Sequence, residues 1–296
     1  MKSQASRAAF GRPEFIEVEN NVRLHVTDLG DGIPVVLIHG WPFSDAMYEY
    51  QYGHLVKSGC RVIGITMRGF GLSDKPYGEY NYDVFADDIL AVLKQLQLHD
   101  IVLGGFSFGA AAVIRFAAKY NTHGLKKLAL FGSAAPSAAQ REDFPYGLPV
   151  ATLDSLIQLN AVNRPQLIEV FSQLFGASES ALPNEISRWL ANLMMQASGY
   201  TTEQGLLMIR DSDLRSDLKR IKIPTVIFHG RLDKLCPFEL AEQIHSSIEN
   251  SRLFAFEKSG HALFLEEREK FNDDLVKFIK SETTMLREPA VSKEPA

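Results

Sequence analysis

The chain has 296 residues, of which 46% are hydrophobic and 23% are charged, and its formal net charge is −5. Charges of both signs are interspersed without a basic stripe, which argues against a nucleic-acid partner. No apolar stretch is long enough to cross a bilayer, the N-terminus lacks the apolar core of a secretory signal, and two cysteines are too few for a disulfide framework. We therefore expect a soluble, cytoplasmic protein without a membrane partner.

The first half of the sequence alternates between patterns of buried strands and amphipathic helices. The helix after residue 81 is the clearest, because Phe85, Ile89 and Val92 recur at the spacing of a helical face. The elements expected here are strands at 15–18, 23–26, 34–38 and 61–65, a helix at about 82–96, a strand at 101–103, a helix at 109–120 and a strand at 125–131. The first two strands are expected to form an antiparallel hairpin.

The second half is divided by a region of different character. From about residue 134 to 218 the alternation stops, and proline breaks separate several amphipathic stretches, so we expect a helical cap inserted over the end of the sheet. Beyond it we expect a strand at 225–228, a helix at 238–248, a strand at 253–256 and a closing helix at 268–280. The last residues, 281–296, are polar and contain proline, and we expect a disordered tail.

Alternating strands and helices predict an α/β fold, with a mostly parallel, doubly wound sheet of eight strands. The expected organisation is a core domain in two parts, 1–133 and 219–280, interrupted by the cap at 134–218 and followed by the tail at 281–296. In such a sheet the carboxyl ends of the strands gather at one edge, where ligands bind. The loops that follow the strands are therefore the expected location of an active site.

A glycine-flanked serine lies in one of these loops, in the segment Gly105-Phe106-Ser107-Phe108-Gly109. It follows a buried strand and precedes a helix with many small residues. A sharp strand-to-helix turn leaves no room for side chains two residues to either side of its central residue, which explains both glycines. Such a turn holds the serine in a strained backbone conformation with its hydroxyl exposed. Ser107 is therefore the predicted nucleophile.

Two further loops at the same edge complete a predicted catalytic triad. Asp233 ends the segment HGRLD after the strand at 225–228, and His261 ends the segment SGH after the last strand. A serine hydroxyl needs a base to take its proton, and a carboxylate on the other imidazole nitrogen fixes the tautomer of that base. We expect Glu266 and Glu267 to belong to the solvated start of the last helix.

The same geometry predicts an oxyanion hole. One donor is expected to be the backbone N–H of Phe108, directly after the nucleophile. The second is expected from the loop after His39 and Gly40, as the N–H of Trp41, because Pro42 has none.

Neither a cofactor nor a metal is expected. The loop at 67–74 contains Gly-x-Gly but lacks a dinucleotide fingerprint and a P-loop lysine, and no histidine, cysteine or carboxylate cluster has metal-ligand spacing. Aromatic residues of the cap are candidates for an acyl pocket, although helical spacing favours a plain core role for each. These candidates are Phe144, Tyr146, Phe171, Phe175 and Trp189.

Taken together, these segments resemble the α/β-hydrolase superfamily from about residue 15 to 280. The closer resemblance is to the bacterial cofactor-free, non-haem haloperoxidases, which are esterases and perhydrolases. The segments that carry it are HGWP at 39–42, RGFGLSD at 68–74, GFSFG at 105–109, HGRLD at 229–233 and SGH at 259–261. The resemblance implies a serine esterase that forms an acyl-enzyme and can pass the acyl group to hydrogen peroxide.

Two residues depart from that family pattern. Thr66 stands where the family usually has aspartate, which implies that the loop of Arg68 lacks its usual supporting acid. Phe108 stands where methionine is common, and its bulkier side chain is expected to change the acyl pocket.

The predicted function is hydrolysis of a small carboxylic ester by Ser107, His261 and Asp233. A lactonase, a thioesterase or a C–C-bond hydrolase would keep the same triad, and a ligand receptor on a hydrolase fold is an alternative of another class. The sequence leaves open the acyl group, the alcohol, the use of peroxide and a homo-oligomeric state.

Overall fold

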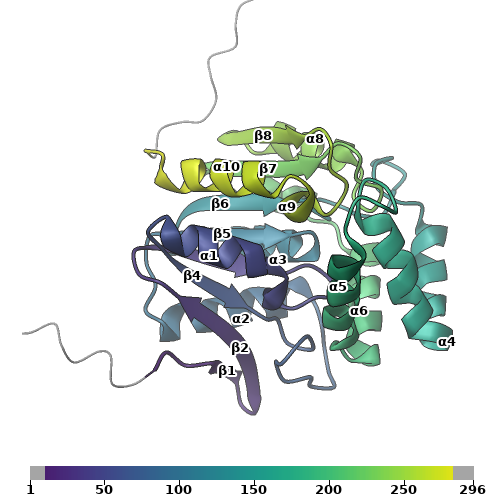
Figure 1. Ribbon diagram of the computed structural model, residues 1–296, viewed down its shortest axis with the longest axis horizontal. Coiled ribbons are helices and arrows are strands. Elements are labelled where there is room, and N and C mark those ends of the chain that lie inside the picture. Colours follow the sequence, from purple (N-terminus) through teal and green to yellow (C-terminus); the bar gives the residue numbers. More distant parts are fainter. Residues whose placement is uncertain (1–10, 283–296) are drawn as a thin grey trace, which may run out of the picture.

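The computed structural model describes residues 11–282, and its centre is an eight-stranded sheet with helices on both faces (Figure 1). The strand order across the sheet is β1-β2-β4-β3-β5-β6-β7-β8. The strands are β1 (Phe15–Glu19), β2 (Val22–Leu29), β3 (Ile33–Ile38), β4 (Cys60–Ile65), β5 (Ile101–Phe106), β6 (Leu125–Phe131), β7 (Thr225–Gly230) and β8 (Ser251–Phe256). All eight strands were expected, and their bounds agree to within a few residues.

Only β2 runs against both of its neighbours, β1 and β4, whereas the strands from β4 to β8 are parallel. Every residue of β5 and of β7 is buried, because helices cover both faces of the central sheet. The predicted doubly wound, mostly parallel sheet is confirmed.

The helices form two layers and a cap. In chain order they are the 3-10 helix η1 (Asp45–Tyr48), α1 (Glu49–Lys57), α2 (Tyr82–Gln95), α3 (Phe108–Lys119), α4 (Val150–Phe175), α5 (Asn184–Met195), α6 (Gly199–Asp211), α7 (Arg215–Leu218), α8 (Phe238–Ser247), α9 (Leu263–Glu266) and α10 (Arg268–Lys280). Buried residues of α2, α3 and α8 pack on one face of the sheet, and those of α1 and α10 pack on the other. None of the helices within residues 11–282 is both long and apolar enough to cross a membrane.

Helices α4, α5 and α6 gather at one end of the sheet (Figure 1). They lie within the cap expected at 134–218, whose boundaries stay a prediction. Helix α4 is broken by non-helical backbone angles at Asn163, so that Pro165 stands in the first turn of its second half. This second half is one of the amphipathic stretches expected in the cap.

The buried side chain of Lys127 fixes the end of α10. Its Nζ donates to the carbonyl oxygens of Phe278 and Ser281, both at 2.6 Å. A cation at a helix C-terminus satisfies carbonyls that have no helical partner. The expected disordered tail at 281–296 thus begins with a residue held by the core, and its part from 283 onward lies outside the described residues.

The loop of Arg68 has acidic partners other than the one that Thr66 replaces. Arg68 donates from Nε and Nη2 to the two carboxylate oxygens of Asp88 at 2.7 and 2.6 Å, and from Nη1 to Glu19 at 2.9 Å. The hydroxyl of Thr66 itself donates to the buried carboxylate of Asp45. The acid that the family usually has at position 66 is absent, as expected, but the carboxylates of Asp88 and Glu19 hold Arg68 instead.

Asp45 is the centre of a buried polar network. Tyr52 donates to its Oδ2 at 2.8 Å, and His25 Nδ1 lies 3.2 Å from its Oδ1. Burial alone would raise the pKa of Asp45, but hydrogen bonds from His25, Thr27 and Thr66 lower it to about 2. The hydrogen bond to Asp45 raises the pKa of His25 above its ordinary value of 6.5. The charged pair of His25 and Asp45 therefore stabilises the fold at pH values between the pKa of Asp45 and that of His25.

Asp45→Asn is expected to lower the free energy of unfolding by about 2 kcal/mol or more, because it leaves buried donors without a charged acceptor. The stabilisation by Asp45 is present above its unfolded pKa of 3.8 and is lost as the pH falls toward 2. The stabilisation by His25 is present below its unfolded pKa of 6.5 and is lost as the pH rises through its raised pKa in the folded state. Urea unfolding at about pH 3, 5 and 9 should therefore show the largest deficit near pH 5. A deficit independent of pH, or one matched by the exposed control Glu249→Gln, would contradict this prediction.

Candidate active site

Ser107 occupies the sharp turn between β5 and α3, with φ 53° and ψ −115°. A Cβ on Gly105 would lie 2.5 Å from the carbonyl oxygen of Gly109, and one on Gly109 would lie 2.3 Å from that of His39. No other residue fits either position without moving backbone. The N–H of Ser107 donates to the carbonyl of Phe131 at 2.8 Å, which ties the turn to the neighbouring strand. The sequence thus folds into the elbow that the glycines predicted.

Asp233 follows β7, and its carboxylate is fully engaged. Its Oδ1 accepts the backbone N–H groups of Leu235 and Cys236 at 2.9 and 2.8 Å. Its Oδ2 lies 2.7 Å from Nδ1 of His261. Because an ionised carboxylate only accepts hydrogen bonds, Nδ1 of His261 carries the proton, and Nε2 is left as the basic nitrogen.

His261 is buried and packs against two aromatic rings. The rings of Phe106 and Phe175 lie 4.7 and 5.5 Å from the imidazole, centroid to centroid. The next residue, Ala262, donates its N–H to the carbonyl of Phe175 at 2.9 Å, so the loop is also tied to the end of cap helix α4. These contacts limit the movement of the imidazole.

Glu267 caps the start of the last helix, as expected, whereas Glu266 ends the preceding helix α9, and the expectation that both are solvated is wrong. Both are partly buried, and their carboxylates turn back toward the loop of His261. Glu266 accepts the N–H of Gly260 at 2.8 Å, and Glu267 accepts the hydroxyl of Ser259 at 2.7 Å. The backbone and hydroxyl donors of this loop attract the carboxylates away from solvent.

Ser107 and His261 line a common cavity of about 50 Å³ beneath the cap. The thiol of Cys236 lines the same cavity; burial raises its pKa, and the nearby hydroxyl of Ser107 opposes that rise. The rest of the wall is apolar and comes from the core and from α4 and α6: Trp41, Ala134, Ala138, Leu148, Leu153, Leu156, Phe171, Leu206, Ile209 and Leu235. The structure therefore brings Ser107, His261 and Asp233 to one place, and an apolar group of small size fits beside them.

Trp41, predicted as an oxyanion donor, lies between the core and the cap. Its indole Nε1 donates to the carbonyl of Thr202 in α6 at 3.1 Å, and its ring meets that of Phe171 at 5.3 Å. A Cβ on Gly205 would lie 2.4 Å from the indole, so α6 has a notch that fits this ring. The position of the loop after β3 is therefore coupled to the cap.

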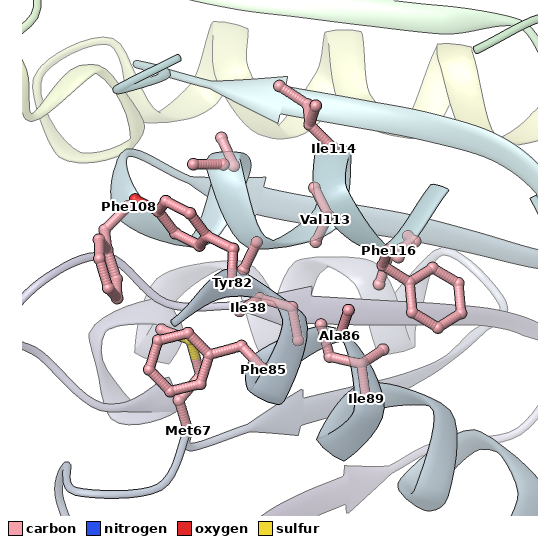
Figure 2. Close-up of a cluster of buried hydrophobic side chains, with 14 of the residues drawn as sticks. Ile38, Met67, Tyr82, Phe85, Ala86, Ile89, Phe108, Val113, Ile114 and Phe116 are labelled. Carbon is pink, nitrogen blue, oxygen red and sulfur yellow. The ribbon is translucent and has the colours of Figure 1, made fainter. Parts of the chain in front are cut away.

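Phe108 is the first residue of α3, where a backbone N–H has no carbonyl partner within the helix. Its side chain lies in the hydrophobic core rather than in the cavity wall, beside Tyr82 and near Phe85 and Met67 (Figure 2). The ring centroids of Tyr82 and Phe85 are 5.2 and 5.6 Å from that of Phe108. The expectation that Phe108 changes the acyl pocket is thus wrong, because the helix directs this side chain away from it.

Sequence reasoning gave no separate role to His39, which supports the predicted oxyanion loop. It is fully buried, its Nδ1 lies 2.8 Å from the carbonyl of Gly40, and its Nε2 accepts the N–H of Met67 at 3.0 Å. Burial lowers the pKa of His39 to about 4, so the ring is neutral and can both donate and accept. The signal in the sequence that could have indicated this role is the position of His39 directly after a buried strand.

Of the five aromatic candidates in the cap, Phe171 lines the cavity. Phe175 packs against His261, whereas Phe144 and Tyr146 belong to a separate cluster and Trp189 contacts Tyr50. Within residues 11–282, no group of three or more histidine, cysteine or carboxylate side chains is arranged to hold a metal ion.

Comparison with known proteins agrees with this architecture. The family model described as the alpha/beta hydrolase fold matches residues 33–268. The chain belongs to the α/β-hydrolase family. The AB hydrolase superfamily protein YisY of Bacillus subtilis is 41% identical to this hydrolase over 268 residues, which cover 90% of this chain and 99% of that protein.

Two further similarities concern chemistry. The structure of an esterase (EaEST) from Exiguobacterium antarcticum matches this hydrolase with a TM-score of 0.88 and 41% identity, over 91% of this chain and 100% of that chain. The non-heme haloperoxidase of Rhodococcus erythropolis is 30% identical over 275 residues, which cover 90% and 99% of the two chains. This hydrolase is therefore an α/β-hydrolase enzyme, and its predicted resemblance to the non-haem haloperoxidase branch is confirmed.

Proposed function

We propose that this enzyme hydrolyses small carboxylic esters through an acyl-enzyme, with Ser107 as nucleophile, His261 as general base and Asp233 as the acid that orients it. The observation that carries the proposal is the shared position of the three side chains. Ser107 and His261 line one cavity, and the carboxylate of Asp233 lies 2.7 Å from the far nitrogen of the imidazole. The esterase relative with the same fold supports the same chemistry.

Acylation follows from these positions. The Oγ of Ser107 attacks the ester carbonyl carbon while its proton passes to Nε2 of His261. The electron pair of the carbonyl bond moves to oxygen, where the backbone N–H groups of Phe108 and Trp41 stabilise the negative charge. When the tetrahedral intermediate collapses, the C–O bond to the alcohol breaks, and the alcohol leaves with the proton from His261. Asp233 stabilises the imidazolium during both steps.

Deacylation repeats these steps with water as the nucleophile, which releases the carboxylic acid and restores the hydroxyl of Ser107. Hydrogen peroxide in place of water would take the acyl group as a percarboxylic acid, without any change in the oxidation state of the enzyme. The haloperoxidase relative favours this side activity. Percarboxylic acid released in this way would oxidise bromide in solution.

The cavity supports a substrate class. Its volume is about 50 Å³, and its wall is apolar apart from Ser107, His261 and the thiol of Cys236. Cavities that hold drug-sized ligands are several times larger, on the order of 300 Å³ or more. We therefore propose an ester with a short, uncharged acyl group.

A serine-directed alkyl phosphonate tests the proposal most directly. It is expected to stop turnover after modification of one residue per chain, and mass spectrometry should find the phosphonyl group on the peptide that contains Ser107. The wall of the same cavity holds a second nucleophile, Cys236, as an internal control. Label on Cys236 with Ser107 unmodified would contradict the proposal.

Competition between esters, lactones, thioesters and vinylogous diketones in the same assay separates the remaining reactions of this triad. The preferred class is the one that protects Ser107 from the phosphonate at the lowest concentration. A single burst of product with a stable adduct, instead of multiple turnover, would support the receptor alternative.

A further inference from the structure

Glu266 joins the loop of His261 to the cap. Its Oε2 accepts the N–H of Gly260 at 2.8 Å, and its Oε1 accepts the N–H of Ala177 at 2.8 Å. Gly260 directly precedes His261, and Ala177 directly follows the C-terminal end of cap helix α4 and its capping residue, Gly176. One carboxylate therefore holds two backbone segments together, one from the loop of His261 and one from the end of cap helix α4.

The two segments are in very close contact. A Cβ on Gly260 would lie 2.5 Å from both the nitrogen of Ala177 and the carbonyl carbon of Gly176. The N–H groups of Gly260 and Ala177 point to the same carboxylate, so each would lack this acceptor if the side chain were removed. The two N–H groups are brought close together by this packing, and the negative charge of the carboxylate stabilises both of them.

We propose that Glu266 is a positioning residue for His261, which fixes the imidazole relative to Ser107 and Asp233 by holding its loop against the end of α4. The inference rests on the proposed function, because it assigns Glu266 a part in the proton transfer through His261. Catalysis of this kind is sensitive to position, since a misplacement of about 1 Å can reduce the rate on the order of a hundredfold.

The surroundings of the carboxylate raise the pKa of Glu266, which links its two hydrogen bonds to pH. Burial raises the pKa of Glu266, while the N–H groups of Ala177 and Gly260 lower it, and the nearby carboxylates Asp233 and Glu267 raise it. A protonated Glu266 would present one O–H donor to an N–H donor and would release one of the two segments.

The decisive variant is Glu266→Gln, which keeps the shape of the side chain but has one acceptor oxygen for two donors. Its amide NH2 must face either Gly260 or Ala177. Glu269→Gln is the matched control, because it removes the same charge from an exposed position three residues further along the chain. For both variants we propose to measure kcat and KM with p-nitrophenyl acetate over a range of pH.

Glu266→Gln is expected to lower kcat on the order of tenfold or more, with KM nearly unchanged and with a shift in the pH profile of kcat/KM. Glu269→Gln should behave like the wild type. A second readout is the low-field proton resonance of the His261–Asp233 hydrogen bond, assigned by its absence in His261→Ala. It should shift or broaden in Glu266→Gln and in Glu266→Asp, whose carboxylate is one methylene shorter.

The failures of the two proposals are distinguishable. If Ser107→Ala retains turnover, the proposed function is wrong, whatever Glu266 does. If Ser107→Ala is inactive but Glu266→Gln keeps the wild-type kcat, pH profile and low-field resonance, the positioning role is wrong. Should Glu266→Gln fail to fold, Glu266→Asp decides by the same criteria, and wild-type values in that variant would overturn the proposal.

Discussion

Replacing Ser107 with alanine is expected to lower kcat for short-chain esters on the order of 10⁵- to 10⁶-fold. The variant keeps the cavity, His261 and the proposed oxyanion donors, but it has no atom that can form the acyl-enzyme. Peroxide-dependent oxidation of bromide should disappear together with ester hydrolysis, because both reactions would start from the same acyl-enzyme. Steady-state assays with p-nitrophenyl acetate, with and without peroxide and bromide, measure both activities.

Ser133→Ala is the appropriate control for this experiment. Ser133 is also a buried serine in a loop that follows a strand at the same sheet edge, and its Oγ accepts the N–H of Ala135 at 3.2 Å. Its removal should leave most of the turnover intact. If both variants were equally active, or if Ser107→Ala lost only bromide oxidation, the acyl-enzyme mechanism would be rejected.

The sheet could be predicted because burial on both faces leaves a simple trace in the sequence. Each central strand is a short apolar run, as in β5 and β7, and each is followed by a loop or helix with a different pattern. The proposed triad could be assembled from the sequence for a related reason, since Ser107, Asp233 and His261 all follow strand ends. A residue that follows a strand in the sequence lies at the edge of the sheet where the carboxyl ends of the strands gather.

Several helices escaped prediction because their sequences favour a helix weakly. Helix α1 has the sequence EYQYGHLVK and buries a glutamine and a tyrosine beside one leucine. Helix α6 contains two glycines and two threonines, which have low helix propensity. Its start did carry a signal, since the Ser198 side chain accepts the N–H of Thr201 as an N-cap.

Contacts between distant segments were the part that sequence could not supply. Glu266 looked like an ordinary acidic residue near a helix start, and its burial depends on Gly260 and on Ala177, which lies 89 residues earlier. The contact between Thr66 and Asp45 is of the same kind, because no local pattern connects these two residues. In both cases the tertiary packing decides which residues meet, and the spacing of apolar residues in the sequence does not indicate it.

Asp233→Asn is expected to lower kcat on the order of 10⁴-fold while the fold and the cavity are retained. The hydrogen bonds of the carboxylate decide how an asparagine must orient. Its oxygen has to take the place of Oδ1, which accepts the N–H groups of Leu235 and Cys236, because an NH2 group there would face two donors. The NH2 group then points to Nδ1 of His261, which becomes an acceptor.

That orientation places the proton of the neutral imidazole on Nε2, the nitrogen that must accept the proton of Ser107. The variant should therefore bind substrate with little change in KM, react slowly with the phosphonate and regain part of its rate with increasing pH as hydroxide replaces the base. Measuring kcat, KM and the labelling rate of Ser107 against pH tests each of these effects. An unchanged kcat would assign the acid to another residue, whereas slow turnover with a normal labelling rate would place the defect after acylation. The asymmetric use of the two oxygens, one for the backbone and one for His261, is what makes the direction of the effect predictable.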